Sequence, residues 1–314
     1  MTSKYPTPYD AQFDVKAKIA QLFIYPIKSC GAIELKEAVL TDTGLDLDRA
    51  WMVVDDAPEK KGEFLTQREL PRMALIQPTL TSFDMIVKAP GMSALKLAID
   101  EVAEPVTVTV WDDTVKAFDM GDEAADWFSD FLSKDQTVRK NVRLVRFDPE
   151  QKRLSSMQWT KGIEAKNGFD DGFAVLVTSV ASLKVLNDKL TAAGEKAITM
   201  QRLRPNVVLT GIEAYEEDRL DTLHITTQQG EAQLKHVKPC ARCTMPDVDL
   251  QNGKQGTAVA DMLQTYRANP LMDGAVTFGM NAIVLNGEGA TLRVGQAVGA
   301  DVAFVLDLTK AQNL

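Results

Sequence analysis

Two cysteines near residue 240 have the spacing in this sequence that most directly suggests chemistry. Cys240 and Cys243 lie in the stretch HVKPCARCT, separated by two residues, and Arg242 stands between them. The chain of 314 residues has one further cysteine, Cys30. Two thiols at this spacing suit half of a zinc site, a redox disulfide, a catalytic nucleophile or a single ligand to a heavier metal.

The rest of the sequence weakens the first three alternatives without excluding them. A structural zinc ion takes about four ligands, and the chain has only two histidines, His224 and His236, and no second C-x-x-C. A redox C-x-x-C normally opens a helix after a strand, whereas Pro239 precedes this pair and a loop-like stretch follows it. A nucleophilic cysteine needs a histidine base, and both histidines lie in strand-like patterns. The fourth alternative is one thiolate bound to a soft metal that an organic cofactor carries.

A cofactor with a phosphate group would need basic side chains elsewhere in the chain. The sequence offers such residues in short motifs: Lys28 and Ser29 in YPIKSCG, Arg49 in LDLDRAW, Arg68 in FLTQRELP, and Arg202 and Arg204 in RLRPNVV. Each of these charges, taken alone, is more often a solvated surface group. Composition and spacing do not show whether they converge on one site.

The pattern of apolar residues predicts many short strands and few helices. VTVTVWDDTVKAFDM is the clearest hairpin, with its turn at Asp112 and Asp113. Apolar residues at helical spacing predict a helix over 122–134, and further helices are expected within 179–194 and 257–267. The polar, weakly patterned stretch 151–172 predicts a long loop, which in a compact domain is often functional.

These elements predict a mainly β protein with a few helices, of the α+β class. Many short strands with turn signals favour a barrel or a sandwich over a parallel sheet. The predicted organisation is an extension at residues 1–16, a first β-rich domain at residues 17–145 and a second at residues 146–314.

Composition limits the expected partners. The chain is 45% hydrophobic and 25% charged, with a formal net charge of -9. An acidic chain repels nucleic acid and anionic membranes, so neither is an expected partner. The first residues lack the apolar core of a signal peptide, and no apolar run approaches the roughly 20 residues of a membrane span. Together with the few cysteines, these features predict a cytoplasmic protein.

Nine short motifs, taken in order, resemble the MOSC family, named for the C-terminal domain of molybdenum cofactor sulfurases. The resemblance is to the two-domain branch that contains the mitochondrial amidoxime-reducing component and its bacterial relatives, and it runs from about Lys18 to Leu308. The motifs are LFIYPIKSC, GLDLDRAWMVVD, FLTQRELPRMALI, FDDGFAVLVTSVASL, RLRPNVVLTG, EDRL, VKPCARCT, FGMN and LRVGQAV.

The resemblance implies an N-terminal β-rich domain followed by a MOSC β-barrel that binds molybdenum cofactor, a pterin with a dithiolene and a phosphate. It implies that Cys243 is the protein ligand to molybdenum and that Cys240 is a more buried, dispensable neighbour on the same loop. Pro239 is expected to help end the strand before that loop. The cofactor-binding residues that the resemblance implies are Lys28, Ser29, Arg49, Gly172, Phe173, Arg204, Asn206, Ala241, Arg242 and Asn281.

The same resemblance implies an oxidoreductase that reduces N-hydroxylated compounds at a thiolate-ligated molybdenum. The alternative is a protein that carries the cofactor or its sulfur with little turnover. The chain departs from the family pattern at Ala241, where relatives often have serine, and at Leu220, where they have an aromatic residue. No cysteine follows Cys243, so we expect no intrinsic iron–sulfur cluster and a separate flavin or iron–sulfur protein as electron donor.

Overall fold

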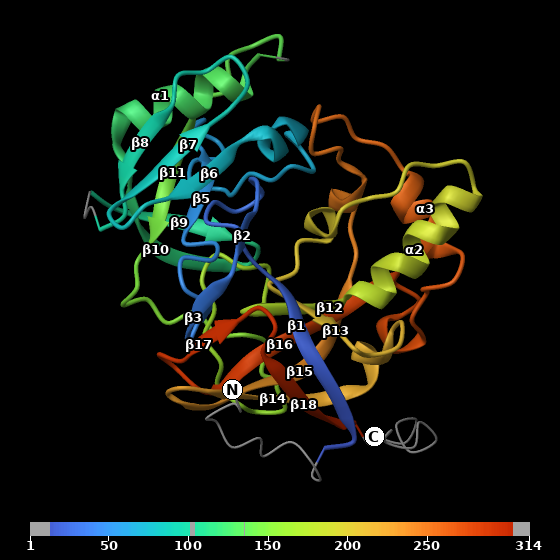
Figure 1. The fold of residues 1–314 in the computed structure, drawn as a ribbon. Helices are drawn as coiled ribbons and strands as arrows, with labels where there is room; N and C mark the ends of the chain where they lie inside the picture. Colours follow the sequence, from blue (N-terminus) through green and yellow to red (C-terminus); the bar gives the residue numbers. More distant parts are fainter. Residues whose placement is uncertain (1–12, 101–103, 135, 304–314) are drawn as a thin grey trace.

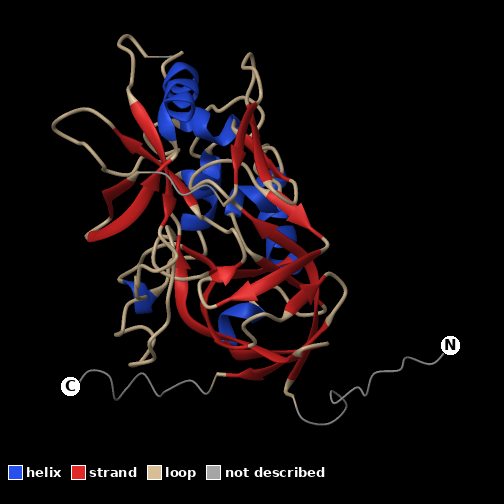
Figure 2. Cartoon of the chain, turned by 90° about the vertical axis from the view of Figure 1, so that its left-hand side faces the viewer, coloured by secondary structure: helices blue, strands red, loops and turns tan. Residues whose placement is uncertain are grey.

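A computed structural model describes residues 13–100, 104–134 and 136–303. The chain forms a barrel and a smaller β-rich unit that lies against one side of it, and both are built mainly from strands (Figures 1 and 2). The predicted mainly β class with few helices is therefore confirmed. The expected extension falls largely on residues 1–12, which lie outside the described residues.

Seven strands close into the barrel. Neighbouring strands are antiparallel except for one parallel pair, β12 and β13, and the ring closes because β13 also pairs with β1. In sheet order the strands are β13 (Val207–Thr210), β12 (Val175–Ser179), β16 (Thr277–Asn286), β15 (Gly230–Ala241), β14 (Leu220–Thr227), β18 (Ala297–Val302) and β1 (Val15–Ile24), and β2 (Ile33–Leu35) extends the sheet beyond β1.

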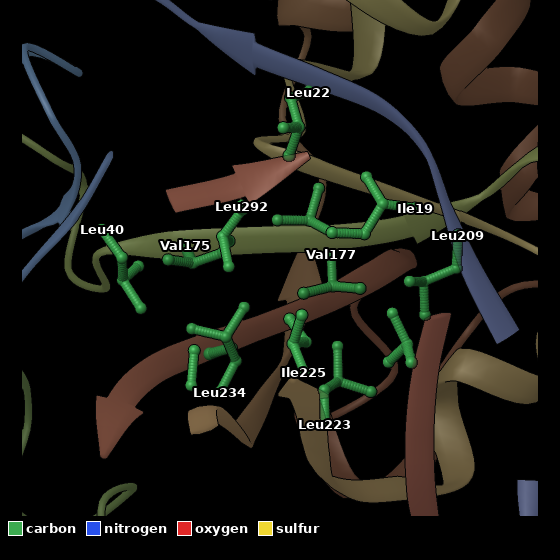
Figure 3. Close-up of a cluster of buried hydrophobic side chains, with 14 of the residues drawn as sticks. Ile19, Leu22, Leu40, Val175, Val177, Leu209, Leu223, Ile225, Leu234 and Leu292 are labelled. Carbon is green, nitrogen blue, oxygen red and sulfur yellow. The ribbon is translucent and has the colours of Figure 1, made fainter. Parts of the chain in front are cut away.

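The barrel interior is filled by aliphatic side chains (Figure 3). Alternate residues of each strand point inward, as Leu223 and Ile225 do on β14. Val177 from β12 and Leu209 from β13 reach the same interior. Burying each such side chain contributes roughly 1.5–3 kcal/mol, so this core holds in place the strand ends that carry the site.

The smaller unit combines two sheets and one helix. Its four-stranded sheet has the order β5 (Trp51–Asp55), β11 (Val142–Phe147), β10 (Asp113–Asp119) and β9 (Pro105–Val110). Its three-stranded sheet is β6 (Gln77–Leu80), β7 (Asp84–Lys88) and β8 (Leu95–Ala98). The predicted helix is α1 (Gly121–Leu132), whose apolar face is buried in the core between these sheets.

The predicted hairpin is present, with its turn one residue earlier than expected. Val110 pairs with Asp113, so the two-residue turn is Trp111 and Asp112. Trp111 has a φ of 55°, the left-handed conformation that tight hairpin turns require. An aspartate pair was the stronger turn signal in the sequence, but the register of the flanking valines places the turn on the tryptophan.

The two units are interleaved in sequence. The N-terminal strand β1 belongs to the barrel, and a small sheet joins β3 (Glu37–Thr41) and β4 (Gly44–Leu45) to β17 (Thr291–Arg293) from the far end of the chain. The polypeptide then builds the smaller unit before returning to the barrel at β12 (Figure 1). The division at residue 145 stays a prediction, and the topology shows that the first strand crosses it.

Two helices cover one outer side of the barrel. The helices α2 (Val180–Ala192) and α3 (Ala258–Gln264) fall within the predicted ranges. They pack with the outward-facing Phe23, Tyr25 and Phe278 in a second apolar cluster. Stretch 151–172 has a single isolated bridge, Leu154 to Lys166, as its β structure, in line with the predicted long loop.

One expectation about the cysteine stretch is wrong. Strand β15 does not end before Pro239 but continues through it to Ala241. Pro239 pairs with Met280 of β16, and the register shifts on both sides of that pair. Such bulges leave positions where no ladder hydrogen bond is needed, so the missing proline N–H is tolerated. Cys240 therefore lies on a strand, and Cys243 lies on the loop that follows.

Candidate functional site

A single pocket gathers the side chains that the sequence nominated. It lies where the loops after β1 and β4 meet the ends of barrel strands, and its volume is about 120 Å³. All eleven predicted site residues line it: Lys28, Ser29, Arg49, Gly172, Phe173, Arg204, Asn206, Ala241, Arg242, Cys243 and Asn281. Convergence, which composition and spacing left open, is therefore observed, whereas Arg68 and Arg202 do not line the pocket.

Two arginines of the pocket stack on one buried tyrosine. The guanidinium carbons of Arg49 and Arg204 lie 4.5 and 4.2 Å from the ring centre of Tyr25. The backbone carbonyl of Arg204 accepts a hydrogen bond from Arg49 at 3.1 Å. Burial, with repulsion from Arg49, lowers the pKa of Arg204 to about 10. The two cations are thus held on one tyrosine ring in a buried environment that would favour a bound anion.

Asp48 and Asn206 fix this arginine pair from behind. Asp48 forms an ion pair with Arg49 and accepts hydrogen bonds from the Tyr25 N–H at 2.7 Å and the Asn206 amide at 2.8 Å. The Asn206 side-chain oxygen accepts from the Leu176 N–H at 3.0 Å. The Asn206 amide also donates to the Phe23 carbonyl at 3.2 Å, so this side chain links β1, β12 and the loop after β4.

Lys28 and Ser29 form the wall contributed by the loop after β1. The Lys28 ammonium donates to the Phe169 carbonyl at 2.7 Å and to Asp171 at 2.6 Å, and the residue is 4% exposed. Burial lowers the pKa of Lys28 although Asp171 acts to raise it. The Ser29 hydroxyl is buried and has no hydrogen-bond partner among the described residues.

Three site residues have a left-handed backbone. Ser29, Arg49 and Arg204 have φ values of 66°, 48° and 58°. This conformation costs about 1–3 kcal/mol for a residue with a Cβ and persists only where the surroundings impose it. Three such residues line one pocket, which indicates that the backbone strain is kept because it directs their side chains into the pocket.

The cysteine pair forms the opposite wall. Cys243 is exposed and Cys240 is partly buried, as expected, and both are free thiols. Arg242 donates to the Cys240 sulfur at 3.2 Å and to the Leu203 carbonyl at 2.8 Å. Its Nε atom is buried without a partner among the described residues. Arg242 therefore ties the cysteine loop to the loop that carries Arg204.

Two aspartates in the pocket were missed by the sequence reasoning. Asp170 and Asp171 precede the nominated Gly172 and Phe173, so the same FDDGF motif contained the signal. Asp170 is 5% exposed, and its carboxylate lies 3.8 Å from Arg49. Burial, with repulsion from Asp48, raises the pKa of Asp170 to about 7. A buried carboxyl that titrates near neutrality is able to hold or release a proton at this site.

The donor set fits the phosphate group of a cofactor. Four cationic and two acidic side chains line the pocket, and the unpartnered Ser29 hydroxyl and Arg242 Nε are donors that a phosphate oxygen would satisfy. The exposed Cys243 thiol would add one soft ligand if a metal were bound beside it. Across the described ranges, no group of three or more His, Cys, Asp or Glu residues could hold a metal ion by itself. No helix among the described residues is long and apolar enough to cross a membrane.

The closed barrel identifies a mainly β protein, and the cation-rich pocket with its exposed thiol is a candidate ligand site at the barrel's edge. The MOSC N-terminal beta barrel domain model matches residues 16–135, and the MOSC domain model matches residues 164–299. The chain therefore belongs to the MOSC family, which confirms the resemblance carried by its motifs.

Curated relatives agree with this assignment. The chain is 33% identical to mitochondrial amidoxime reducing component 2 of Bos taurus over 244 residues. That match covers 75% of this chain and 67% of the bovine protein. The human protein of the same name is 32% identical over 258 residues, covering 79% of this chain and 72% of its own. The molybdenum cofactor sulfurase of Bos taurus is 29% identical over 269 residues, which is 82% of this chain but 29% of that protein.

Proposed function

We propose that this protein binds molybdenum cofactor and reduces N-hydroxylated compounds. The observation that carries the proposal is the convergence of the eleven nominated residues on one pocket, with Cys243 exposed at its rim. Relatives named amidoxime reducing components, 32–33% identical over three quarters of the chain, support the reaction class. When bound, the cofactor supplies a two-electron redox centre that accepts oxygen from the substrate.

The pocket residues have separate roles in this proposal. Ser29, Arg49 and Arg204 bind the anionic part of the cofactor through charge-assisted hydrogen bonds. Arg242 holds the cysteine loop in place through its contacts with Cys240 and the Leu203 carbonyl. Cys243 offers a thiolate, which suits a soft metal.

The reaction consumes protons as well as electrons. An N–O bond breaks, an N–H bond replaces it and water leaves, so each turnover takes up two electrons and two protons. A separate flavin or iron–sulfur protein supplies the electrons in this proposal, and a cytoplasmic location stays a prediction. Asp170, with a pKa of about 7, is a pocket group that could hold one of the protons between transfers.

The test is to purify the protein, measure bound molybdenum and pterin, and assay benzamidoxime reduction with a chemical electron donor. Cys243→Ser should lower turnover at least about 100-fold, because a hydroxyl is a poor substitute for a thiolate ligand. Cys240→Ser is the matched control and should retain most of the turnover. Equal losses from both substitutions would contradict the proposal and favour a site that uses both thiols.

A cofactor or sulfur carrier is the second candidate. The match to molybdenum cofactor sulfurase over 82% of this chain favours it. The same purified protein distinguishes the two functions, since a carrier would contain pterin and molybdenum but turn over neither benzamidoxime nor hydroxylamine.

A further inference from the structure

A second pocket meets the candidate site at the cysteine loop. It shares Arg242 and Cys243 with the first pocket and has a volume of about 280 Å³. Its remaining lining is largely apolar and comes from α3 and from the segment before β16, with Val259, Ala260, Leu263, Ala275 and Val276 among its residues.

The two pockets have opposite chemistry. The first is lined by four cations and two carboxylates, whereas, among the residues that the structure describes, Arg242 is the one charged residue that lines the second. Cys243 is exposed where they meet. A ligand with a polar head and an apolar body would therefore place the head at the thiol and the body against α3, because the second pocket offers the more apolar lining and burial of apolar surface is favourable there.

The apolar wall is held rigidly. Val259 and Leu263 are each 1% exposed and pack in the cluster that joins α3 to α2. Asp247 accepts hydrogen bonds from the backbone N–H groups of Val259 and Ala260 at 2.8 and 3.2 Å. On the other side, the Arg242 N–H donates to the Val276 carbonyl at 2.8 Å. A wall fixed on both sides binds a ligand with little cost of reorganisation.

We infer that this pocket receives the non-reacting body of the substrate, and that the body is a compact, uncharged aromatic or aliphatic group. The inference rests on the proposed function and specifies the substrate class of that same site. The volume lies near the lower end of the roughly 300–1,000 Å³ typical of small-molecule pockets, which fits one ring. Arg242 at the rim disfavours a cationic body, and the apolar wall disfavours an anionic one.

Binding of benzamidoxime, measured by calorimetry, tests the inference without turnover. Ala260→Phe and Ala275→Phe fill the pocket from its two walls and should each raise the Kd about tenfold or more. Ala192→Phe, at the exposed end of α2, is the matched control and should leave the Kd unchanged. Molybdenum and pterin content should be the same in all four proteins.

A second measurement does not depend on the variants folding. In methyl-labelled wild-type protein, the benzamidoxime ring protons should show nuclear Overhauser contacts to the methyl groups of Ala260 and Val276, which are both partly exposed in the pocket.

Several results would overturn the inference: no saturable binding to the wild type, no such contacts at saturation, or pocket variants that bind as tightly as the control. Loss of pterin in folded pocket variants would also overturn it, since the pocket would then hold cofactor. Pocket-dependent binding without reduction of benzamidoxime or hydroxylamine would instead leave this pocket in place and refute the proposed function.

Discussion

The Ser29 hydroxyl has a role in the proposed cofactor site but none in the hydrogen bonding of the described fold. Its hydroxyl is buried without a partner among the described residues, so Ser29→Ala should change the free energy of unfolding by less than about 0.5 kcal/mol. Bound pterin should nevertheless fall, because the proposed site would lose a donor to the cofactor's phosphate. Ser129→Ala is the control: that buried hydroxyl accepts from the Val142 N–H at 3.0 Å, so stability should fall by about 1 kcal/mol while pterin content holds. Denaturant unfolding and pterin fluorescence separate the two effects, and normal pterin content in Ser29→Ala would contradict the role.

Asp170 makes stability depend on pH in a defined direction. Its pKa is about 7 in the folded protein and should be about 3.9 in the unfolded chain. Between these values the folded protein keeps a proton that the unfolded chain has released, so the stabilising contribution is complete at low pH and is lost as the pH rises towards 7.

The free energy of unfolding of the wild type, relative to Asp170→Asn, should therefore fall by a few kcal/mol between about pH 4 and 7, at roughly 1.4 kcal/mol per pKa unit. Urea unfolding of both proteins across this range measures the difference. A difference that does not vary with pH would show that Asp170 is ionised throughout.

At the scale of elements, β16 has a glycine that its neighbour requires. Gly279 has a φ of 77°, and a Cβ there would lie 2.6 Å from the Val177 carbonyl oxygen on β12. Gly289 has a similar φ of 80° but open space around it. Gly289→Ala should cost about 1–2 kcal/mol from the left-handed backbone alone, and Gly279→Ala should cost clearly more because two strands must separate. Equal losses of unfolding free energy in the two variants, measured by denaturant unfolding, would mean that β12 can move away from β16 at little cost.

Elements were predictable from sequence where periodicity was strong. The helix at 122–134 and the hairpin of alternating valines follow from local pattern. The end of β15 was not predictable in this way. Local rules disfavour proline in a strand, whereas bulges on both sides of Pro239 accommodate it. Bulges depend on the partner strand, so a single strand's sequence does not reveal them.

At the scale of the whole molecule, convergence of the site depended on topology. The basic residues come from positions 28 to 242, and nothing local to Lys28 or Arg204 indicates that their side chains line one pocket. Ordered motifs typical of the MOSC family predicted that convergence, whereas composition alone could not. Asp170 was missed because a buried acid among arginines resembles any loop aspartate in sequence.

The interleaved topology predicts that the barrel cannot form without strand β1. Strand β1 closes the ring between β13 and β18, and its Ile19 and Leu22 are buried in the barrel core. A fragment of residues 146–314 would expose two unpaired strand edges and part of that core, so it should aggregate or unfold without cooperativity.

Adding residues 13–45 as a separate peptide should restore a cooperative transition by supplying β1, whereas the same peptide with Ile19→Asp and Leu22→Asp should not. Circular dichroism during thermal unfolding distinguishes these outcomes. A fragment of residues 146–314 that unfolds cooperatively by itself would show that β1 only lines the barrel, and that the boundary near residue 145 separates two independent folding units.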